Sequence, residues 1–279
     1  MFSIMADSRF FYSLRHVARR VSAAVATDCP LCGLRAAGGA LCRGCRDDIT
    51  QTMRTNDDRC DRCAQRGPRR GQACPSCAAM APVFRRTVAA FDYEPPFDSL
   101  IGRYKGEHRF GLSTTLAQLL AEAIGRAGGV QPTDRRVGAR SPEPVSPART
   151  YALPAGTVLV PIPGSGASLR RRGFNPAAEL AAGLGGCLQL PVRRAVLRRL
   201  REGQRQAFSG RLARRVATQG LFDCAALAPG TAVGLVDDVM TTGSTVNAAA
   251  RALLQAGATE VTVLVAARTP WKDFGGPQD

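Results

Sequence analysis

The chain has 279 residues, of which 45% are hydrophobic and 22% charged, and its formal net charge is +16. This composition excludes an intrinsically disordered protein, and the length allows one large α/β domain or two smaller ones. No apolar run approaches the roughly 18 residues of a transmembrane helix, and residues 1–27 lack the apolar segment of a secretory signal. We therefore expect a cytoplasmic protein with no membrane span.

Arginine supplies almost all of the positive charge, because Lys105 and Lys272 are the only lysines. Such a basic balance favours an anionic partner, such as nucleic acid, a phosphate ligand or a membrane surface. A GC-rich genome would enrich arginine without any functional consequence. A binding site must therefore be argued from the spacing of residues and not from the total charge.

After a leader at residues 1–28, which need not be folded, comes a cysteine-rich module at residues 29–80. Four C-x-x-C pairs contain eight of the ten cysteines: Cys29, Cys32, Cys42, Cys45, Cys60, Cys63, Cys74 and Cys77. The module has too few apolar residues to fold by burial alone. Two thiolates at this spacing reach one zinc ion at about 2.3 Å, and two pairs complete a tetrahedral shell. We predict two zinc ions, both structural because their thiolate shells are complete.

The four C-x-x-C pairs can combine around two zinc ions in two ways. The short gaps within Cys29–Cys45 and within Cys60–Cys77 favour sequential pairing, but the spacing also allows an interleaved arrangement. A disulfide framework is the alternative to metal, and it would need an oxidising compartment. The two isolated cysteines, Cys187 and Cys224, are expected to be core thiols.

Residues 85–268 alternate apolar strands with amphipathic helices. Strands are expected at 87–93, 157–163, 195–200, 231–238 and 260–268, and helices at 97–105, 112–124, 176–188 and 244–258. A flexible insertion is expected at 127–156, where Gly, Pro, Arg and Ser dominate, and a tail at 269–279. Near-continuously apolar strands that alternate with helices predict an α/β fold with a parallel sheet covered on both faces.

The segment Val233–Thr245 places two adjacent carboxylates, Asp237 and Asp238, at the end of an apolar strand. Ligands of open α/β sheets bind at this edge. The carboxylates could accept hydrogen bonds from ribose hydroxyls. The turn into the next helix offers free amides for a phosphate, and the residues expected to hold it are Thr241, Thr242, Gly243, Ser244 and Thr245. The alternative is an ordinary capped helix beside two solvated aspartates.

This segment resembles the phosphoribosyl pyrophosphate (PRPP) motif of type I phosphoribosyltransferases. The whole layout resembles the ComF family, named for a competence protein involved in DNA uptake. The resemblance covers about residues 29–268, apart from the insertion, and rests on the cysteine pairs, RYKGEHR, VPIPGSGASLRRRGFN, VDDVMTTGST and a closing LVAAR. It implies a type I phosphoribosyltransferase-like sheet flanked by helices, preceded by a small double zinc-ribbon module.

The resemblance also implies roles for individual residues. Asp237 and Asp238 would bind the ribose hydroxyls at the reacting centre, and Thr241 to Thr245 the 5-phosphate. Further substrate-binding positions are Pro163, Gly164, Ser165, Arg170, Arg172, Arg214 and Lys105. Arg214 lies in the stretch 201–219, which resembles the mobile loop of the family, although Ala217 stands where the family has Asn and Ser209 where it has Leu. Magnesium would accompany PRPP.

Two functions are therefore expected, and they can coexist. The first is binding of PRPP or ribose 5-phosphate with magnesium, with phosphoribosyl transfer as its enzymatic form. The second is handling of single-stranded DNA, with DNA-uptake proteins as partners, through the zinc ribbons and arginines. Base stacking on the ribbons has no platform, because Cys29–Cys77 contains no aromatic residue.

Overall fold

The computed structural model describes residues 25–53, 59–67, 73–106, 111–127, 153–200 and 220–271. The chain forms two compact units, Met1–Asp48 and Ile49–Asp279. In the first unit, β1 (Ala26–Asp28) pairs with β2 (Arg35–Ala37) in an antiparallel hairpin, and α2 (Arg43–Gln51) begins. In the described part of the chain, no helix is both long and apolar enough to cross a membrane.

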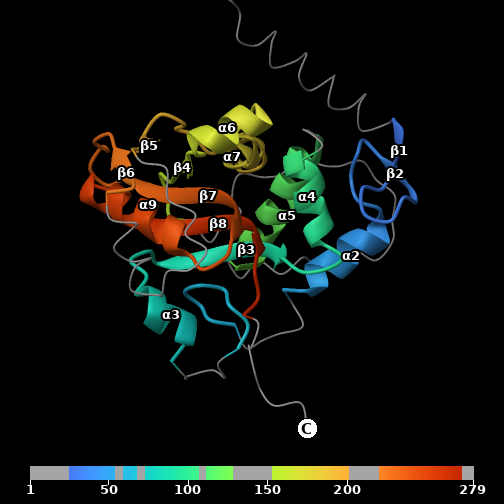
Figure 1. Ribbon diagram of the computed structural model, residues 1–279, viewed down its shortest axis with the longest axis horizontal. Helices are drawn as coiled ribbons and strands as arrows, with labels where there is room; N and C mark the ends of the chain where they lie inside the picture. Colours follow the sequence, from blue (N-terminus) through green and yellow to red (C-terminus); the bar gives the residue numbers. More distant parts are fainter. Residues whose placement is uncertain are drawn as a thin grey trace, which may run out of the picture. The chain divides into compact units, whose positions relative to one another are not determined.

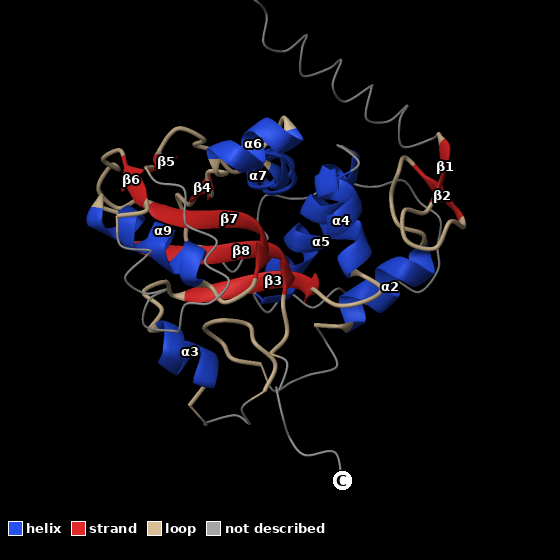
Figure 2. Cartoon of the chain, in the orientation of Figure 1, coloured by secondary structure: helices blue, strands red, loops and turns tan. Residues whose placement is uncertain are grey.

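The second unit is built on a four-stranded parallel sheet (Figure 1). Its strands, in spatial order, are β3 (Arg86–Asp92), β8 (Glu260–Arg268), β7 (Ala232–Met240) and β4 (Val158–Pro161). Helices α5 (Gly111–Ala127) and α7 (Pro176–Leu188) pack on one face, and α9 (Ser244–Gln255) packs on the other (Figure 2). This arrangement confirms the predicted α/β fold with a covered parallel sheet.

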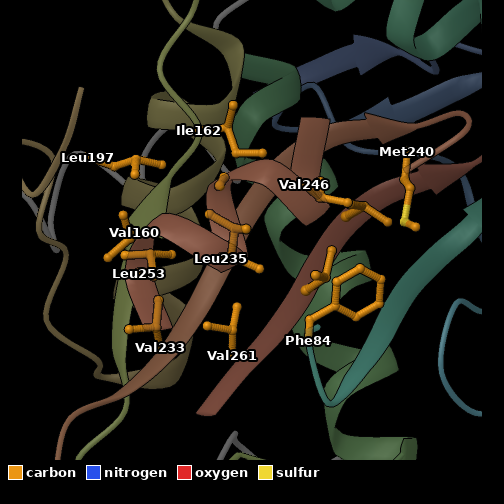
Figure 3. Packing of buried hydrophobic residues seen from close by; sticks show 14 of the residues in the cluster. Phe84, Val160, Ile162, Leu197, Val233, Leu235, Met240, Val246, Leu253 and Val261 are labelled. Carbon is orange, nitrogen blue, oxygen red and sulfur yellow. The ribbon is translucent and has the colours of Figure 1, made fainter. Parts of the chain in front are cut away.

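Alternating side chains of the strands form the core beneath α9. Val233 and Leu235 on β7 point to the same face, where they lie in one buried cluster with Val246 and Leu253 of α9 (Figure 3). Val261 of β8 belongs to the same cluster. Near-complete burial of both sheet faces explains why these strands read as continuous apolar runs in the sequence.

The predicted strands and helices of the second unit are confirmed, with differences of a few residues at their ends. The helix predicted at 97–105 is α4 (Asp98–Gly106). The described residues also form α3 (Pro75–Met80) and α6 (Gly166–Arg172), which the sequence did not predict. The strand predicted at 195–200 is β5 (Leu197–Arg199), which pairs antiparallel with β6 (Phe222–Cys224), outside the main sheet. Most of the predicted insertion and the whole stretch 201–219 lie outside the described residues. The prediction that Cys187 is a core thiol is wrong, because this cysteine is exposed on α7, while Cys224 is half-buried.

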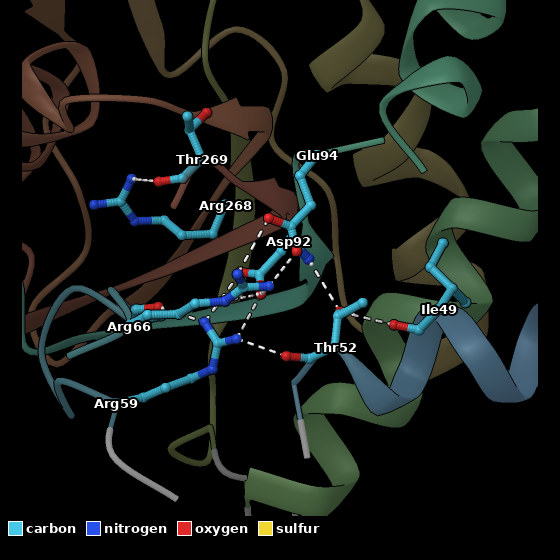
Figure 4. A network of polar contacts seen from close by, with 9 residues as sticks. Ile49, Thr52, Arg59, Arg66, Asp92, Glu94, Arg268 and Thr269 are labelled. Atoms are coloured by element: carbon cyan, nitrogen blue, oxygen red, sulfur yellow. Dashed lines mark hydrogen bonds and ion pairs between the residues drawn. The ribbon is translucent and has the colours of Figure 1, made fainter. Parts of the chain in front are cut away.

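A buried carboxylate attaches the hairpin of the third cysteine pair to the end of β3. Asp92 is fully buried, and both of its oxygens accept hydrogen bonds from Arg59, at 3.0 and 2.6 Å (Figure 4). Arg66 donates through Nε to the same carboxylate at 2.7 Å and also pairs with Glu94. Arg59 and Arg66 face each other in an isolated β-bridge, so one carboxylate holds both sides of the hairpin.

Replacing Asp92 by asparagine is expected to lower the free energy of unfolding by about 3 kcal/mol, because it removes the partner of a mostly buried arginine. Urea denaturation followed by circular dichroism measures this loss. The matched control is Asp223→Asn, which breaks an exposed pair with Arg198 and should change stability by less than about 1 kcal/mol. Equal losses in the two variants would contradict a structural role for the buried network.

Candidate functional site

The candidate site lies at the carboxyl edge of β4 and β7, which are neighbours in the sheet. β4 stays paired with β7 to its end: Pro161 is in register with Val236, and the amide of Ile162 donates to the carbonyl of Val236 at 2.9 Å. The loop Pro163–Ser165 therefore starts beside the point where β7 delivers Asp237 and Asp238. Two segments that are about 70 residues apart in sequence thus meet at one sheet edge, where open α/β folds bind ligands.

The two aspartates sit in different surroundings. Successive residues of a strand point to opposite faces, so Asp237 follows Leu235 toward the α9 side and Asp238 points the other way. Asp238 is buried, with its Oδ2 at 2.8 Å from Nζ of Lys105. Each carboxylate also accepts the backbone N–H of the following residue at 2.9 Å. These bonds fix both carboxylates while leaving further lone pairs for a ligand.

Lys105 reaches Asp238 because α4 is anchored by the residue before it. The buried Tyr104 donates its hydroxyl hydrogen to the carbonyl of Pro176 at 2.8 Å and packs edge-on against Phe174, with ring centroids 5.8 Å apart. Burial, and then the charge of Asp238, raise the pKa of Tyr104, which keeps this phenol neutral. The structure thus brings Lys105 of RYKGEHR to the acid pair.

Desolvation, and then the charge of Asp238, raise the pKa of Asp237 well above its usual value. The folded state therefore holds this proton more tightly than the unfolded state. Stability from this group is complete below the unfolded-state pKa of about 3.9 and falls as the pH rises toward the higher folded-state pKa.

Asp237→Asn is accordingly expected to stabilise the protein at neutral pH, because it removes a carboxylate that is costly to ionise. The gain in melting temperature over the wild type should increase as the pH rises from 5 toward 8. Differential scanning fluorimetry in a pH series measures it, with Asp223→Asn as the exposed control. A variant that is less stable than wild type at pH 8 would contradict the raised pKa.

The turn between β7 and α9 exposes hydroxyl groups and leads into the first amides of α9. Thr241 and Thr242 are exposed, while Ser244 is half-buried with its Oγ at 3.1 Å from Oγ1 of Thr242. Gly243 has φ +82°, and a Cβ there would lie 2.4 Å from Sδ of Met80. The glycine is therefore required both by the backbone and by the close packing above it. The first N–H groups of α9 have no intrahelical acceptor and attract anions.

The loop after β4 leads into α6, a short helix that the sequence did not reveal. Ser165 caps it, because its Oγ accepts the N–H of Ser168 at 3.2 Å. Arg170 is exposed and Arg172 is half-buried on this helix. The structure thus places the predicted arginines on a short helix that begins at the candidate pyrophosphate loop.

The R-G-F-N segment after Arg171 has structural roles. Gly173 ends α6 with φ +72°. Phe174 packs against Tyr104, as described above. Asn175 donates through Nδ2 to the carbonyl of Ile162 at 2.9 Å, and its Oδ1 accepts the N–H of Ala177 at 3.2 Å. This asparagine therefore clamps the loop after β4 to the start of α7.

Sequence reasoning missed Arg199 as a member of this region. Its Nε donates to the carbonyl of Pro163 at 3.3 Å, and its guanidinium lies 5.1 Å from the ring centroid of Phe222. Arg199 thus supports the loop after β4 from the β5–β6 ribbon, and no local pattern marks it among its basic neighbours. Arg214 lies outside the described residues.

The eight paired cysteines form two groups of four, in sequential order. The first group is Cys29, Cys32, Cys42 and Cys45, and the second is Cys60, Cys63, Cys74 and Cys77; within each group all Sγ atoms lie within 4.8 Å of one another. The shorter Sγ–Sγ distances are 3.7 Å in the first group and 3.5 and 3.6 Å in the second. A zinc tetrahedron with bonds of about 2.3 Å has edges of about 3.8 Å, so both groups fit zinc.

The backbone prepares the first cysteine of each group as a ligand. Burial alone would raise the pKa of Cys29, but hydrogen bonds from the backbone of Cys32, Cys42 and Leu31 lower it to about 6. In the second group burial again acts to raise the pKa of Cys60, but hydrogen bonds from the backbone of Cys63 and Arg62 outweigh it, so the pKa of Cys60 is lowered. The thiolate is the form that binds zinc.

No protein-family model matches the chain. Among curated proteins, Competence protein F of Haemophilus influenzae is 28% identical over 238 residues, which cover 84% of this chain and 93% of that protein. DNA utilization protein YhgH of Escherichia coli K12 is 28% identical over 246 residues, or 86% and 96% of the two chains. The solved structure of TT1426 from Thermus thermophilus aligns with a TM-score of 0.30 and 16% identity, over 59% of this chain and 86% of that one; this likeness is too weak to carry an argument.

Proposed function

We propose that this chain, whose relatives place it in the ComF family, binds the ribose 5-phosphate group of PRPP or of a related phosphosugar. The observation that carries the proposal is the meeting of two loops at one edge of the phosphoribosyltransferase-like sheet. There the acid pair at the end of β7 adjoins the loop Pro163–Ser165. One edge thus offers acceptors for hydroxyls and donors for phosphates.

Each part of the ligand has a chemically matched partner. Asp237 and Asp238 would accept hydrogen bonds from the ribose hydroxyls, and the amides and hydroxyls of Thr241–Thr245 would hold the 5-phosphate. The loop Pro163–Ser165 would receive the pyrophosphate of PRPP, with Arg170 and Arg172 on α6 as counter-charges. Magnesium, bound by ligand oxygens and water, would neutralise the leaving pyrophosphate if the group is transferred.

Isothermal titration tests this proposal. Ribose 5-phosphate, and PRPP with Mg²⁺, should bind the wild-type protein with one site per chain, whereas inorganic phosphate at equal concentration should bind far more weakly. Asp223→Asn, which removes the carboxylate of an exposed ion pair with Arg198, should bind as wild type does. The proposal is wrong if neither sugar phosphate binds, or if ribose 5-phosphate binds no better than phosphate alone.

A second candidate function is binding of single-stranded DNA. It is favoured by the names of the relatives, a competence protein and a DNA utilization protein, and by exposed arginines such as Arg170 and Arg171. Fluorescence anisotropy with a labelled oligonucleotide should show affinity that falls steeply with salt, because phosphate contacts release counterions; a salt-independent affinity would exclude this function.

A further inference from the structure

A buried arginine joins the second four-cysteine group to the candidate phosphate loop. Arg268, the last residue of β8, is 1% exposed. Its Nε donates to the carbonyl of Cys63 at 2.9 Å, and its Nη1 donates to the carbonyls of Met240, at 3.0 Å, and of Thr241. A further bond from Nη1 to the carbonyl of Thr269, at 2.9 Å, fixes the guanidinium from its own strand end (Figure 4).

The sheet order explains how one side chain reaches both places. β8 lies between β3 and β7, and Arg268 is in register with Asp92 on one side and Met240 on the other. The cysteine hairpin is held at Asp92, and the phosphate loop begins after Met240. Arg268 therefore spans the gap between a zinc-ligand backbone and the backbone that would present amides to a phosphate.

The charge of this arginine also fits the second group. Four thiolates and one Zn²⁺ carry a net charge of about −2, and a buried guanidinium needs nearby negative charge. The hydrogen-bond acceptors that the structure shows for Arg268 are neutral carbonyls. Asp92, which is in register with Arg268 on β3, is one source of negative charge, and a filled second group would add another beside the carbonyl of Cys63.

A second set of hydrogen bonds joins the segment after the last cysteine pair to α9, at the other end of the phosphate loop. Asn247, in the first turns of α9, donates through Nδ2 to the carbonyls of Met80, at 3.2 Å, and Ala81, at 3.3 Å. Its Oδ1 accepts the N–H of Val83 at 2.8 Å. Met80 is three residues after Cys77 and packs over Gly243, where no Cβ would fit. The loop is thus held on both sides by the chain around the second four-cysteine group.

We propose that Arg268 is a positioning residue that couples zinc in the second four-cysteine group to ligand binding at the phosphate loop. This inference rests on the proposed function. Zinc fixes the backbone at Cys63, Arg268 transmits that position to the carbonyls of Met240 and Thr241, and the amides of the loop are thereby oriented for a phosphate. Because such coupling is reciprocal, the sugar phosphate must raise the zinc affinity of the second group.

The experiment measures zinc affinity, by competition with a chelator of known affinity, in the presence and absence of ribose 5-phosphate. It uses Cys32→Ser, which removes a ligand of the first group so that the remaining zinc is that of the second. Saturating ribose 5-phosphate should raise the zinc affinity by about fivefold or more. Adding Asp238→Asn, which weakens binding of the sugar phosphate, controls for direct chelation of zinc by the sugar phosphate: at the ligand concentration that just saturates the parent protein, it should reduce the effect.

Arg268→Lys, made in the same background, keeps the positive charge but has one nitrogen in place of the separate Nε and Nη1 that reach Cys63 on one side and Met240 and Thr241 on the other, so the coupling should fall to about onefold. The matched control is Arg251→Lys on the exposed face of α9, which should retain the full effect. Asn247→Ala tests the second set of hydrogen bonds and should reduce the coupling even if Arg268→Lys fails to fold.

The outcomes separate this inference from the function on which it rests. If ribose 5-phosphate does not bind the wild-type protein, both are overturned. If it binds but leaves the zinc affinity of the second group unchanged, the coupling alone is overturned. Coupling that persists in Arg268→Lys and is lost in Asn247→Ala would overturn the role of Arg268.

Discussion

Replacing Cys63 by serine is expected to abolish the cooperative unfolding transition of the larger unit. Cys63 is fully buried and belongs to the same core cluster as Phe84 and Met240. Structural zinc contributes roughly 10–16 kcal/mol in small metal sites, which exceeds the whole stability of many domains, about 5–15 kcal/mol. Loss of this ligand would also release the hairpin that Asp92 and Arg268 hold. Thermal unfolding followed by circular dichroism, together with zinc content, measures the effect.

The matched control is the same change in the other group. Cys32 is exposed and belongs to the unit Met1–Asp48. Cys32→Ser should lower the zinc content from two ions per chain to one while the larger unit still unfolds cooperatively. Cys187→Ser, at an exposed cysteine outside both groups, should retain two ions. If Cys32→Ser and Cys63→Ser destabilise the protein equally, the second group contributes no more to the stability of the fold than the first.

Asp238→Asn is expected to weaken binding of ribose 5-phosphate by about 10- to 100-fold. A hydrogen bond to a charged group contributes about 1.5–3 kcal/mol, and a tenfold change in affinity corresponds to about 1.4 kcal/mol. The asparagine also leaves Lys105 without the carboxylate that lies 2.8 Å from its Nζ. Titration calorimetry gives the affinity.

Asp223→Asn serves as the control for this variant as well, because its carboxylate is exposed and pairs with Arg198. It should leave the affinity for ribose 5-phosphate unchanged. A ligand affinity that is the same in Asp238→Asn as in wild type would remove Asp238 from the site.

The sequence revealed features whose signals are local. The cysteine pairs are visible because both zinc ligands of a pair lie three residues apart, and apolar strands such as the one predicted at 231–238 are visible as runs. The acid pair could be assigned to a sheet edge because a parallel strand must end there. Which C-x-x-C pairs share a zinc site followed only from the structure, since their spacing allowed two arrangements.

The features that sequence reasoning missed depend on contacts between distant segments. Arg268 is 205 residues from Cys63, and Asp92 is 33 residues from Arg59. The first partnership arises because β8 ends beside β7 and the cysteine hairpin, and the second because that hairpin packs at the end of β3; no local pattern specifies either. α6 was missed for a different reason: it is seven residues long and ends in three arginines, so its apolar face is too small to show a period.

A crystal structure of the protein with ribose 5-phosphate tests the central claim most directly. The account predicts that the phosphate accepts hydrogen bonds from the amides of Thr241–Thr245 and that the ribose hydroxyls donate to Asp237 and Asp238. Density for the sugar phosphate elsewhere on the molecule, with the edge of β7 empty, would contradict it.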